Sequence, residues 1–443
     1  MKTNWLRSLF TLLLVAGCTT AVGPVPTGQT LPSPAASVTV PAHTQMTGET
    51  PTRALDTPLP PAESTPARAS ATPPLFQSIG PDEFPPGINP LSGLPVNDPD
   101  SLKRPPALVS ITNSPVVVRP QAGLSYSPFV YEMYLGEGAS RFLAVFYGDY
   151  PGRSGEDWAA GTRPVVGPIR SGRLPYESLR LLYKGFAVFA SAGIYVLPRL
   201  SEYHIVYNDN DDYNLAMFPV DDLERVAKDF SQELGRPAPL GLRFETQPPA
   251  GGQAGRMIWL PYHTIDQIIW RYDSESGSYH RWQDDGTGQN FTLQTDRLNG
   301  EALTYENVII LFANYHRYTE TLFDIDLLYI DRLPALLFRD GQVYSIYWTT
   351  GNDEYERQTG RFRPPRFEDA QGNPFPLKPG QTWVEIVNRF TPYGETVDSE
   401  DYRTLKNTRQ PGSGVWAVYF FPPELDGWDA WEERVRQEQF LAE

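Results

Sequence analysis

A long stretch rich in Pro, Thr, Ser and Ala most constrains the fold of this chain. It runs over residues 19–77 and contains few large apolar side chains. Such a composition cannot bury enough apolar surface to offset the entropy lost on ordering, and its prolines favour an extended, semi-rigid spacer. A folded body is therefore expected only over residues 78–443, which is long enough for two domains of ordinary size.

The residues before this stretch have the features of a secretory signal peptide. Lys2 and Arg7 form a short positive region, and the apolar run LFTLLLV follows at 9–15. This run is too short to span a bilayer, which needs about 20 residues. The tetrapeptide VAGC, ending at Cys18, then resembles the lipobox of bacterial lipoproteins. We therefore predict a signal peptide over residues 1–17 and a lipidated tether over residues 18–77.

The cysteine usage agrees with this prediction. Cys18 is the only cysteine in 443 residues, so the chain cannot form an internal disulfide. A lone thiol at this position is best explained as an acyl acceptor, although an ordinary signal peptide could also contain it. Two or more acyl chains give durable attachment. The predicted location is the extracytoplasmic face of a bacterial membrane, with the membrane as a partner through the N-terminal lipid.

The charge balance limits the other partners. The chain has 37 basic and 53 acidic residues, a net charge of −16. Without Lys2 and Arg7 the mature chain keeps 35 basic residues and a net charge of −18. This excess of negative charge argues against nucleic acid as a partner and against a second, electrostatic membrane contact.

Short strands and helices alternate over residues 78–236, which predicts a mixed α/β N-terminal domain. The last helix begins with two aspartates and precedes Gly235, as expected for helix ends. The predicted strands are 107–112, 129–134, 142–147 and 186–190, and the predicted helices are 176–183, 194–200 and 221–234.

After a linker-like break at residues 236–254, short strands follow one another with turn residues between them. This pattern predicts a mainly antiparallel β domain over residues 255–390 and an extension over 391–443 with a terminal helix at 428–441. The fold class expected for the chain is α+β. The predicted strands are 257–260, 268–272, 279–282, 308–312, 335–338, 343–348 and 382–387.

A series of motifs follows in a fixed order along the chain. The motifs are NPLSGLPV at 89–96, NSPVVVRPQAGLS at 113–125, VYE at 130–132, EGASRFLAVF at 137–146, GPIRSGR at 167–173, WRYDSESGSYHRW at 270–282, ENVIILF at 306–312 and LKPGQTWVEIV at 377–387. The series resembles the YerB-like bacterial lipoprotein family, which has two adjoining domains of unknown function. The resemblance covers about residues 88–390 and implies a fold and a location, but little about activity. Ser191 departs from the family pattern, which has a histidine in its place.

Several arginines of the first domain lie inside these motifs, against the acidic background. Guanidinium groups bind carboxylate and phosphate oxygens bidentately. If Arg119, Arg170 and Arg173 converge, they form an anion site. The alternative is that glutamates pair with the arginines and only tie strands to loops. The predicted ligand-binding set is Arg119, Gln121, Asn113, Glu132, Glu137, Arg141, Arg170, Ser171 and Arg173.

The sequence contains only weak matches to the residue patterns of enzyme active sites. Glu132 and Glu137 could form a glycosidase pair, but alternation along a strand would place them on opposite faces unless a turn at Gly136 reverses the chain. Ser191 follows a strand and lies thirteen residues before His204, yet the first glycine of a nucleophile elbow is missing, which favours a turn serine. The catalytic residues therefore stay unknown.

No cofactor or metal is expected from the sequence. The histidines at 204, 263, 280 and 316 lack zinc-ligand spacing. The acidic run at 208–212 resembles the start of a calcium loop, but Leu215 stands where that loop needs glycine. A solvated acidic loop is the better interpretation.

These observations predict a non-catalytic envelope lipoprotein that binds peptidoglycan, a wall polymer or a wall-synthesis protein. The alternative is a cell-wall glycan hydrolase that uses the paired carboxylates Glu132 and Glu137. A third hypothesis is a purely structural partner of another membrane protein.

Overall fold

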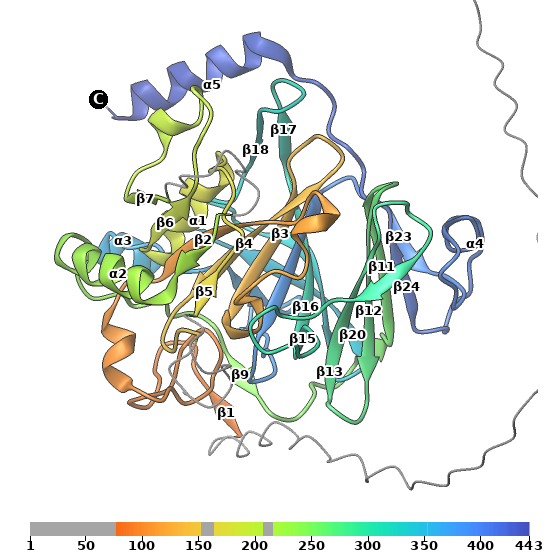
Figure 1. The fold of residues 1–443 in the computed structure, drawn as a ribbon. Helices are drawn as coiled ribbons and strands as arrows, with labels where there is room; N and C mark the ends of the chain where they lie inside the picture. The colour runs from red at the N-terminus through yellow and green to blue at the C-terminus, as the bar shows by residue number, and fades with distance from the viewer. Residues whose placement is uncertain (1–76, 152–163, 207–215, 352, 443) are drawn as a thin grey trace, which may run out of the picture. The chain divides into compact units, whose positions relative to one another are not determined.

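The computed structural model describes residues 77–442, apart from 152–163, 207–215 and 352 (Figure 1). The predicted signal peptide, Cys18, nearly all of the tether and the acidic run at 208–212 lie outside the described residues, so the predictions about them stay predictions. No helix in the described part is long and apolar enough to cross a membrane.

The fold is rich in strands and has few helices, and its centre is an 11-stranded sheet (Figure 1). The strand order is β10-β20-β19-β16-β22-β3-β4-β2-β6-β7, and β21 pairs with β20. The bounds are β2 Ala107–Thr112, β3 Phe129–Tyr134, β4 Ser140–Phe146, β6 Phe186–Phe189, β7 Tyr203–Ile205, β10 Gln253–Ala254, β16 Asn307–Ala313, β19 Leu333–Arg339, β20 Gln342–Thr349, β21 Arg366–Glu368 and β22 Thr382–Asn388.

Both predicted segments contribute strands to this one sheet. Strand β22 from the second segment lies parallel to β3 from the first, with Trp383 opposite Val130. The sheet is therefore continuous across the linker-like break at 236–254. The division into 78–236 and 255–390 stays a prediction about sequence units.

Several strands of the sheet run in the same direction. Strand β2 is parallel to β6, and β22 is parallel to both β3 and β16. Strand β4 is antiparallel to both β2 and β3, so these two run the same way. The carboxyl ends of β2, β3, β6, β16 and β22 consequently meet at one edge of the sheet, the position where ligand sites are common in sheets with parallel strands.

A second, 7-stranded sheet comes from the chain after residue 256. Its order is β14-β13-β12-β11-β24-β23, with β15 pairing with β13. The ring of Trp270 in this sheet lies 5.4 Å from the ring of Trp383 in the central sheet, so large aromatic side chains form the core between the sheets. The bounds are β11 Met257–His263, β12 Asp266–Asp273, β13 Ser278–Asp284, β14 Phe291–Leu293, β15 Thr304–Tyr305, β23 Tyr393–Glu395 and β24 Val415–Val418.

Short two-stranded sheets and helices complete the body. The paired strands are β1 Ser78–Ile79 with β9 Phe244–Glu245, β5 Val165–Val166 with β8 Phe218–Pro219, and β17 Tyr315–Arg317 with β18 Phe323–Ile325. The helices are α1 Pro175–Tyr183, α2 Val220–Leu234, α3 Glu354–Thr359, α4 Tyr402–Asn407 and α5 Gly427–Ala442.

Helix α1 packs on the central sheet, since the hydroxyls of Tyr183 and Tyr131 lie 2.7 Å apart. The helices predicted at 176–183, 221–234 and 428–441 are confirmed. The helix predicted at 194–200 is wrong, because only a 3-10 turn forms at Leu197–Arg199. Pro198 lacks the backbone N–H that a helix through this segment would need.

The terminal helix α5 returns to the body beside the β17–β18 hairpin (Figure 1). Trp431 is buried in a small apolar cluster with Tyr318. The guanidinium of Arg434 pairs with the buried carboxylate of Asp324 at 2.9 Å. An aromatic contact and an ion pair thus hold the helix in place.

Candidate functional site

The predicted ligand residues lie on two opposite faces of the central sheet. Side chains alternate along a strand, so Ser140 and Arg141 point in opposite directions. The Ser140 hydroxyl donates to Glu132 at 2.6 Å, on the face towards the second sheet. Arg141 instead lies near Tyr176 of α1, on the other face. The set therefore divides into two groups, each with its own surroundings.

The first group is a cluster of three guanidinium groups, from Arg141, Arg170 and Arg173, hereafter the three-arginine cluster. Burial first, and then the positive charges of Arg173 and Arg170, lower the pKa of Arg141 to about 10. Burial and the charge of Arg173 likewise lower the pKa of Arg170. The three positive charges are therefore close enough to repel one another.

Among the described residues, the carboxylate that pairs with Arg141 is Glu137, at 3.8 Å. Glu137 is exposed and has a positive φ of 57°, between Gly136 and Gly138 in the tight turn that joins β3 to β4. The Nε atoms of Arg141 and Arg173 are buried and make no hydrogen bond within the described structure. Two directional donors of the cluster thus lack an acceptor among the described residues.

The backbone places the cluster at the carboxyl ends of β2 and β6. The N–H of Arg170 donates to the carbonyl of Ser110 at 2.9 Å, and the N–H of Gly172 donates to that of Ser191 at 2.6 Å. Ser171 and Ser191 have their hydroxyls 3.0 Å apart. Arg173 lies just before α1, whose N-terminus carries positive partial charge. This helix N-terminus favours negative charge beside Arg173.

The second group forms a buried junction between the two sheets, centred on Glu132 and Arg281. Both side chains are almost inaccessible, and their ion pair measures 2.7 Å. Arg281 also donates to Gln283 at 2.7 Å, and Gln283 donates to Asp266 at 2.8 Å. The N–H of Ser140 donates to Asp266 at 2.5 Å. The junction therefore ties the two sheets together by charged hydrogen bonds.

Glu385 on β22 lies directly opposite Glu132 on β3. It accepts hydrogen bonds from the Trp270 indole at 2.9 Å and from the Tyr262 hydroxyl at 3.1 Å. Burial, and then the charge of Glu132, raises the pKa of Glu385 well above its ordinary 4.5. Burial also raises the pKa of Glu132, but Arg281 opposes this shift. We infer that Glu132 carries the charge and Glu385 the proton.

Arg119, Gln121 and Asn113 belong to this junction and not to the three-arginine cluster. Arg119 donates to the carbonyls of Asn113 at 3.1 Å and Asp284 at 2.6 Å. Gln121 donates to the carbonyl of Thr112 at 3.0 Å. The structure therefore places Arg141, rather than Arg119, beside Arg170 and Arg173. The sequence motifs alone do not show that Arg141, inside β4, and not Arg119, after the end of β2, lies beside the other two arginines.

Sequence reasoning missed Arg281, Asp266 and Glu385. Two of them lie inside motifs that were recognised, Arg281 in WRYDSESGSYHRW and Glu385 in LKPGQTWVEIV. One sequence feature could have identified Glu385: a charged residue stands between large apolar residues on a predicted strand, as in TWVEIV. Such a pattern indicates a charged side chain that is buried and has a partner. Asp266 follows a turn and gives no comparable signal.

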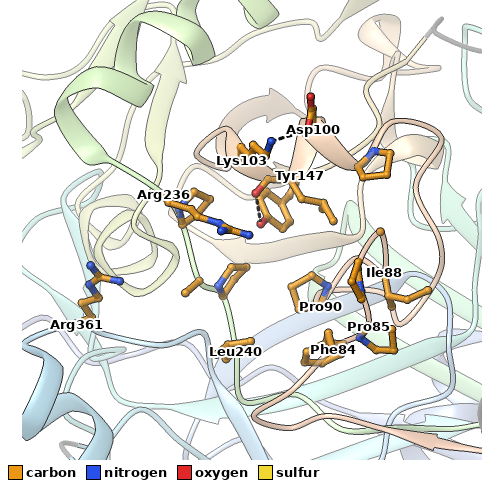
Figure 2. A pocket seen from close by; sticks show the side chains of 17 residues that line it. Phe84, Pro85, Ile88, Pro90, Asp100, Lys103, Tyr147, Arg236, Leu240 and Arg361 are labelled. Atoms are coloured by element: carbon orange, nitrogen blue, oxygen red, sulfur yellow. Dashed lines mark hydrogen bonds and ion pairs between the residues drawn. The ribbon is translucent and has the colours of Figure 1, made fainter.

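A separate apolar hollow of about 420 Å³ lies between residues 84–103 and 236–240 (Figure 2). Its walls are mostly proline and aliphatic side chains. Figure 2 shows Arg236 reaching towards Tyr147, and the ion pair of Lys103 with Asp100 on the rim. None of the predicted ligand-binding residues lines this hollow, so it is not the site that the sequence motifs indicate.

Within the described ranges, no group of three or more His, Cys, Asp or Glu side chains could hold a metal ion. Ser191 is exposed and its hydroxyl contacts Ser171, whereas His204 stacks on Phe218 with ring centroids 5.3 Å apart. This arrangement gives a serine nucleophile no positioned base.

These features define a class of protein: a strand-rich body in which two sequence segments share one sheet, with an arginine cluster at the edge where its parallel strands end. Two family profiles match the chain. The profile described as "Protein of unknown function (DUF3048) N-terminal domain" matches residues 91–242, and its C-terminal counterpart matches residues 258–384. The chain belongs to this family, which confirms the YerB-like resemblance.

Similar proteins of known sequence or structure agree with this family assignment. The chain is 25% identical over 315 residues to the Bacillus subtilis (strain 168) protein named "Putative lipoprotein YerB", covering 67% of this chain and 85% of that protein. The crystal structure of YerB from Bacillus subtilis has a TM-score of 0.51 at 22% identity, over 68% of this chain and 96% of that one. The structural likeness shows a shared fold.

Proposed function

We propose that this protein is a lipid-anchored extracytoplasmic protein that binds, without catalysis, an oxyanion of a bacterial cell-wall component at the three-arginine cluster. The crowding of three guanidinium groups carries the proposal: the charges of Arg173 and Arg170 act on Arg141 and, after burial, lower its pKa to about 10. Among the described residues, the carboxylate whose charge acts on both Arg141 and Arg170 is that of Glu137.

An oxyanion would relieve that repulsion. A carboxylate or phosphate accepts hydrogen bonds from guanidinium Nε and Nη atoms, and such charge-assisted bonds contribute about 1.5–3 kcal/mol each. The unsatisfied Nε atoms of Arg141 and Arg173 are suitable donors. Peptide-stem carboxylates and wall-polymer phosphates share this chemistry.

The anchor would hold this site within reach of the wall. Cys18 ends a lipobox-like tetrapeptide, and a relative in Bacillus subtilis carries the name of a lipoprotein. A proline-rich spacer adds about 3.1 Å per residue when extended, so residues 19–77 would reach up to about 180 Å. That reach is long enough for the body to meet the wall while its lipid stays in the bilayer.

The hydrolase alternative has less support from the geometry. The turn at Gly136 does reverse the chain, but Glu132 is 0% exposed and bonded to Arg281, whereas Glu137 lies on the exposed turn. A buried carboxylate in an ion pair cannot reach a sugar unless the two sheets separate. Binding at the three-arginine cluster does not require the two sheets to separate.

A pull-down with purified sacculi tests the proposal. Full-length protein in neutral detergent should sediment with sacculi at low salt and less at high salt, since exposed charge contacts are screened. Arg170→Gln with Arg173→Gln should abolish sedimentation. Arg225→Gln, which removes an exposed arginine paired with Asp222, is the matched control and should behave like wild type.

Two further arms identify the ligand. If removal of phosphate polymers with hydrofluoric acid abolishes binding, the oxyanion is a phosphate; if binding persists, it is a peptide carboxylate. If the Arg170→Gln, Arg173→Gln variant sediments as much as wild type, the cluster is not the binding site and a protein partner is favoured. Soluble fragments released by wild type but not by Glu132→Gln would favour the hydrolase.

A further inference from the structure

Another hollow, lined largely by polar side chains, lies where the parallel strands β16 and β22 end. Their last residues, Ala313 and Asn388, face each other in register. Asn314 and Arg389 follow directly, and the N–H of Arg389 donates to the carbonyl of Ala313 at 2.8 Å. The hollow has a volume of about 600 Å³, within the range of small-molecule sites. Side chains from adjacent loops converge outside such strand ends.

Two phenyl rings in this hollow are exposed to solvent. Phe390 is 63% exposed and Phe421 is 46% exposed, and both line the hollow. The guanidinium of Arg389 lies 4.6 Å from the centre of the Phe390 ring and covers one face of it. Exposed aromatic rings beside polar groups in a concave surface are typical of a ligand platform rather than of a folding core.

The polar side chains around these rings are fixed by a chain of hydrogen bonds. Arg389 donates to the Asn314 oxygen at 2.9 Å, and Asn314 donates to Asp326 at 3.3 Å. The same Asp326 oxygen lies 3.1 Å from Nε2 of His316. Each group is thus held in one orientation before any ligand arrives, and guanidinium, amide and carboxylate groups keep further hydrogen-bonding capacity.

The charges of the hollow indicate the kind of ligand. Its carboxylates, from Asp326, Glu424 and Asp426, outnumber the lining cations Arg389 and His316 even when the imidazole is protonated. Arg434, which lies 3.4 Å from Asp326, is shared with the carboxylate of Asp324 at 2.9 Å. The hollow is therefore a poor site for an anion. A neutral ligand with many hydroxyl groups and a flat apolar face suits the combination of rings and planar polar groups.

We propose that this hollow is a second binding site and that it binds a neutral carbohydrate. The C–H face of a pyranose would lie on Phe390 or Phe421, and its hydroxyls would exchange hydrogen bonds with Asp326, Asn388 and Arg389. This site does not depend on the three-arginine cluster, because the two sites share no residue. The hollow suits a neutral ligand, whereas the cluster suits an anion.

Calorimetric titration of the full-length protein tests this site, in a detergent without a sugar headgroup. The probes are a neutral β-1,4-linked glucose hexasaccharide and its N-acetylglucosamine counterpart. At least one should bind, and Phe390→Ala with Phe421→Ala should weaken it about tenfold or more. Tyr195→Ala, another exposed ring, is the control and should bind like wild type.

The single variants Phe390→Ala and Arg389→Gln give an independent readout if the double variant unfolds, and each should weaken binding. Arg170→Gln with Arg173→Gln should leave saccharide binding unchanged, which separates this site from the anion site. Failure of both saccharides to bind, or equal affinity for wild type and the Phe390 variants, would overturn the proposal.

Discussion

Replacement of Glu385 by glutamine should stabilise the protein increasingly as the pH rises. Glu385 is fully buried, and its pKa is raised well above 4.5 by burial and by the neighbouring charge of Glu132. A neutral glutamic acid and a glutamine have nearly the same shape. The glutamine can accept from the Trp270 indole and donate to the Tyr262 hydroxyl, so both hydrogen bonds of the wild type are kept.

The magnitude follows from proton linkage. Unfolded Glu385 loses its proton near pH 4.5, whereas the folded protein keeps it. The stability from this group is therefore fully present below pH 4.5 and falls by about 1.4 kcal/mol per pH unit until the folded pKa is reached. Glutamine does not titrate. Relative to wild type, Glu385→Gln should therefore gain stability from pH 4.5 to pH 6.5, at up to about 1.4 kcal/mol per pH unit.

Urea unfolding at these two pH values measures the difference. Glu132→Gln is the matched control on the opposite strand, because it removes the charge that faces Arg281 at 2.7 Å. It leaves a buried guanidinium unpaired and should destabilise the protein by about 3–5 kcal/mol at neutral pH. Equal pH slopes for wild type and Glu385→Gln would refute the assignment of the proton to Glu385.

Three further changes test other parts of the structure. Burial raises the pKa of Asp324 to about 6, so wild type should lose about 2 kcal/mol of stability between pH 4 and 6. Asp324→Asn should remove that loss in urea titrations, and an unchanged pH slope would contradict the prediction. Trp431→Ala should speed amide exchange in α5 but not in the central sheet, because Trp431 is a main apolar contact of that helix. Cys18→Ala should move the protein out of the membrane fraction and remove acyl mass from its N-terminus, whereas firm retention would refute the anchor.

The individual strands could be predicted because each is a short apolar run between turn residues. The predicted range 107–112 coincides with β2, and 129–134 coincides with β3. These runs carry their own signal, since strand residues are β-branched and aromatic. Local composition was therefore sufficient to identify these two strands.

The pairing of the strands could not be predicted. Residues 382–386 of β22 lie beside residues 129–133 of β3, although about 250 residues separate them in the chain. Neither strand contains a feature that selects the other, because both are buried on both faces. The linker-like break at 236–254 suggested two separate sheets, and only the tertiary structure shows one sheet that includes both segments.

The candidate site was predicted in part. Arg170 and Arg173 do lie together, because the short GPIRSGR motif limits how far apart they can be. The predicted third member, Arg119, lies in the junction instead, and Arg141 takes its place because of the face of β4 that it occupies. That face is set by the register of β4 against β2 and β3.

The anion site is tested most directly by calorimetric titration of soluble anionic wall fragments into the full-length protein in neutral detergent. We expect saturable binding that weakens with salt and that falls about a hundredfold when Arg170 and Arg173 are both changed to glutamine, at about tenfold for each lost charge-assisted bond. Indistinguishable isotherms for this variant and wild type, or no binding by wild type, would contradict the account.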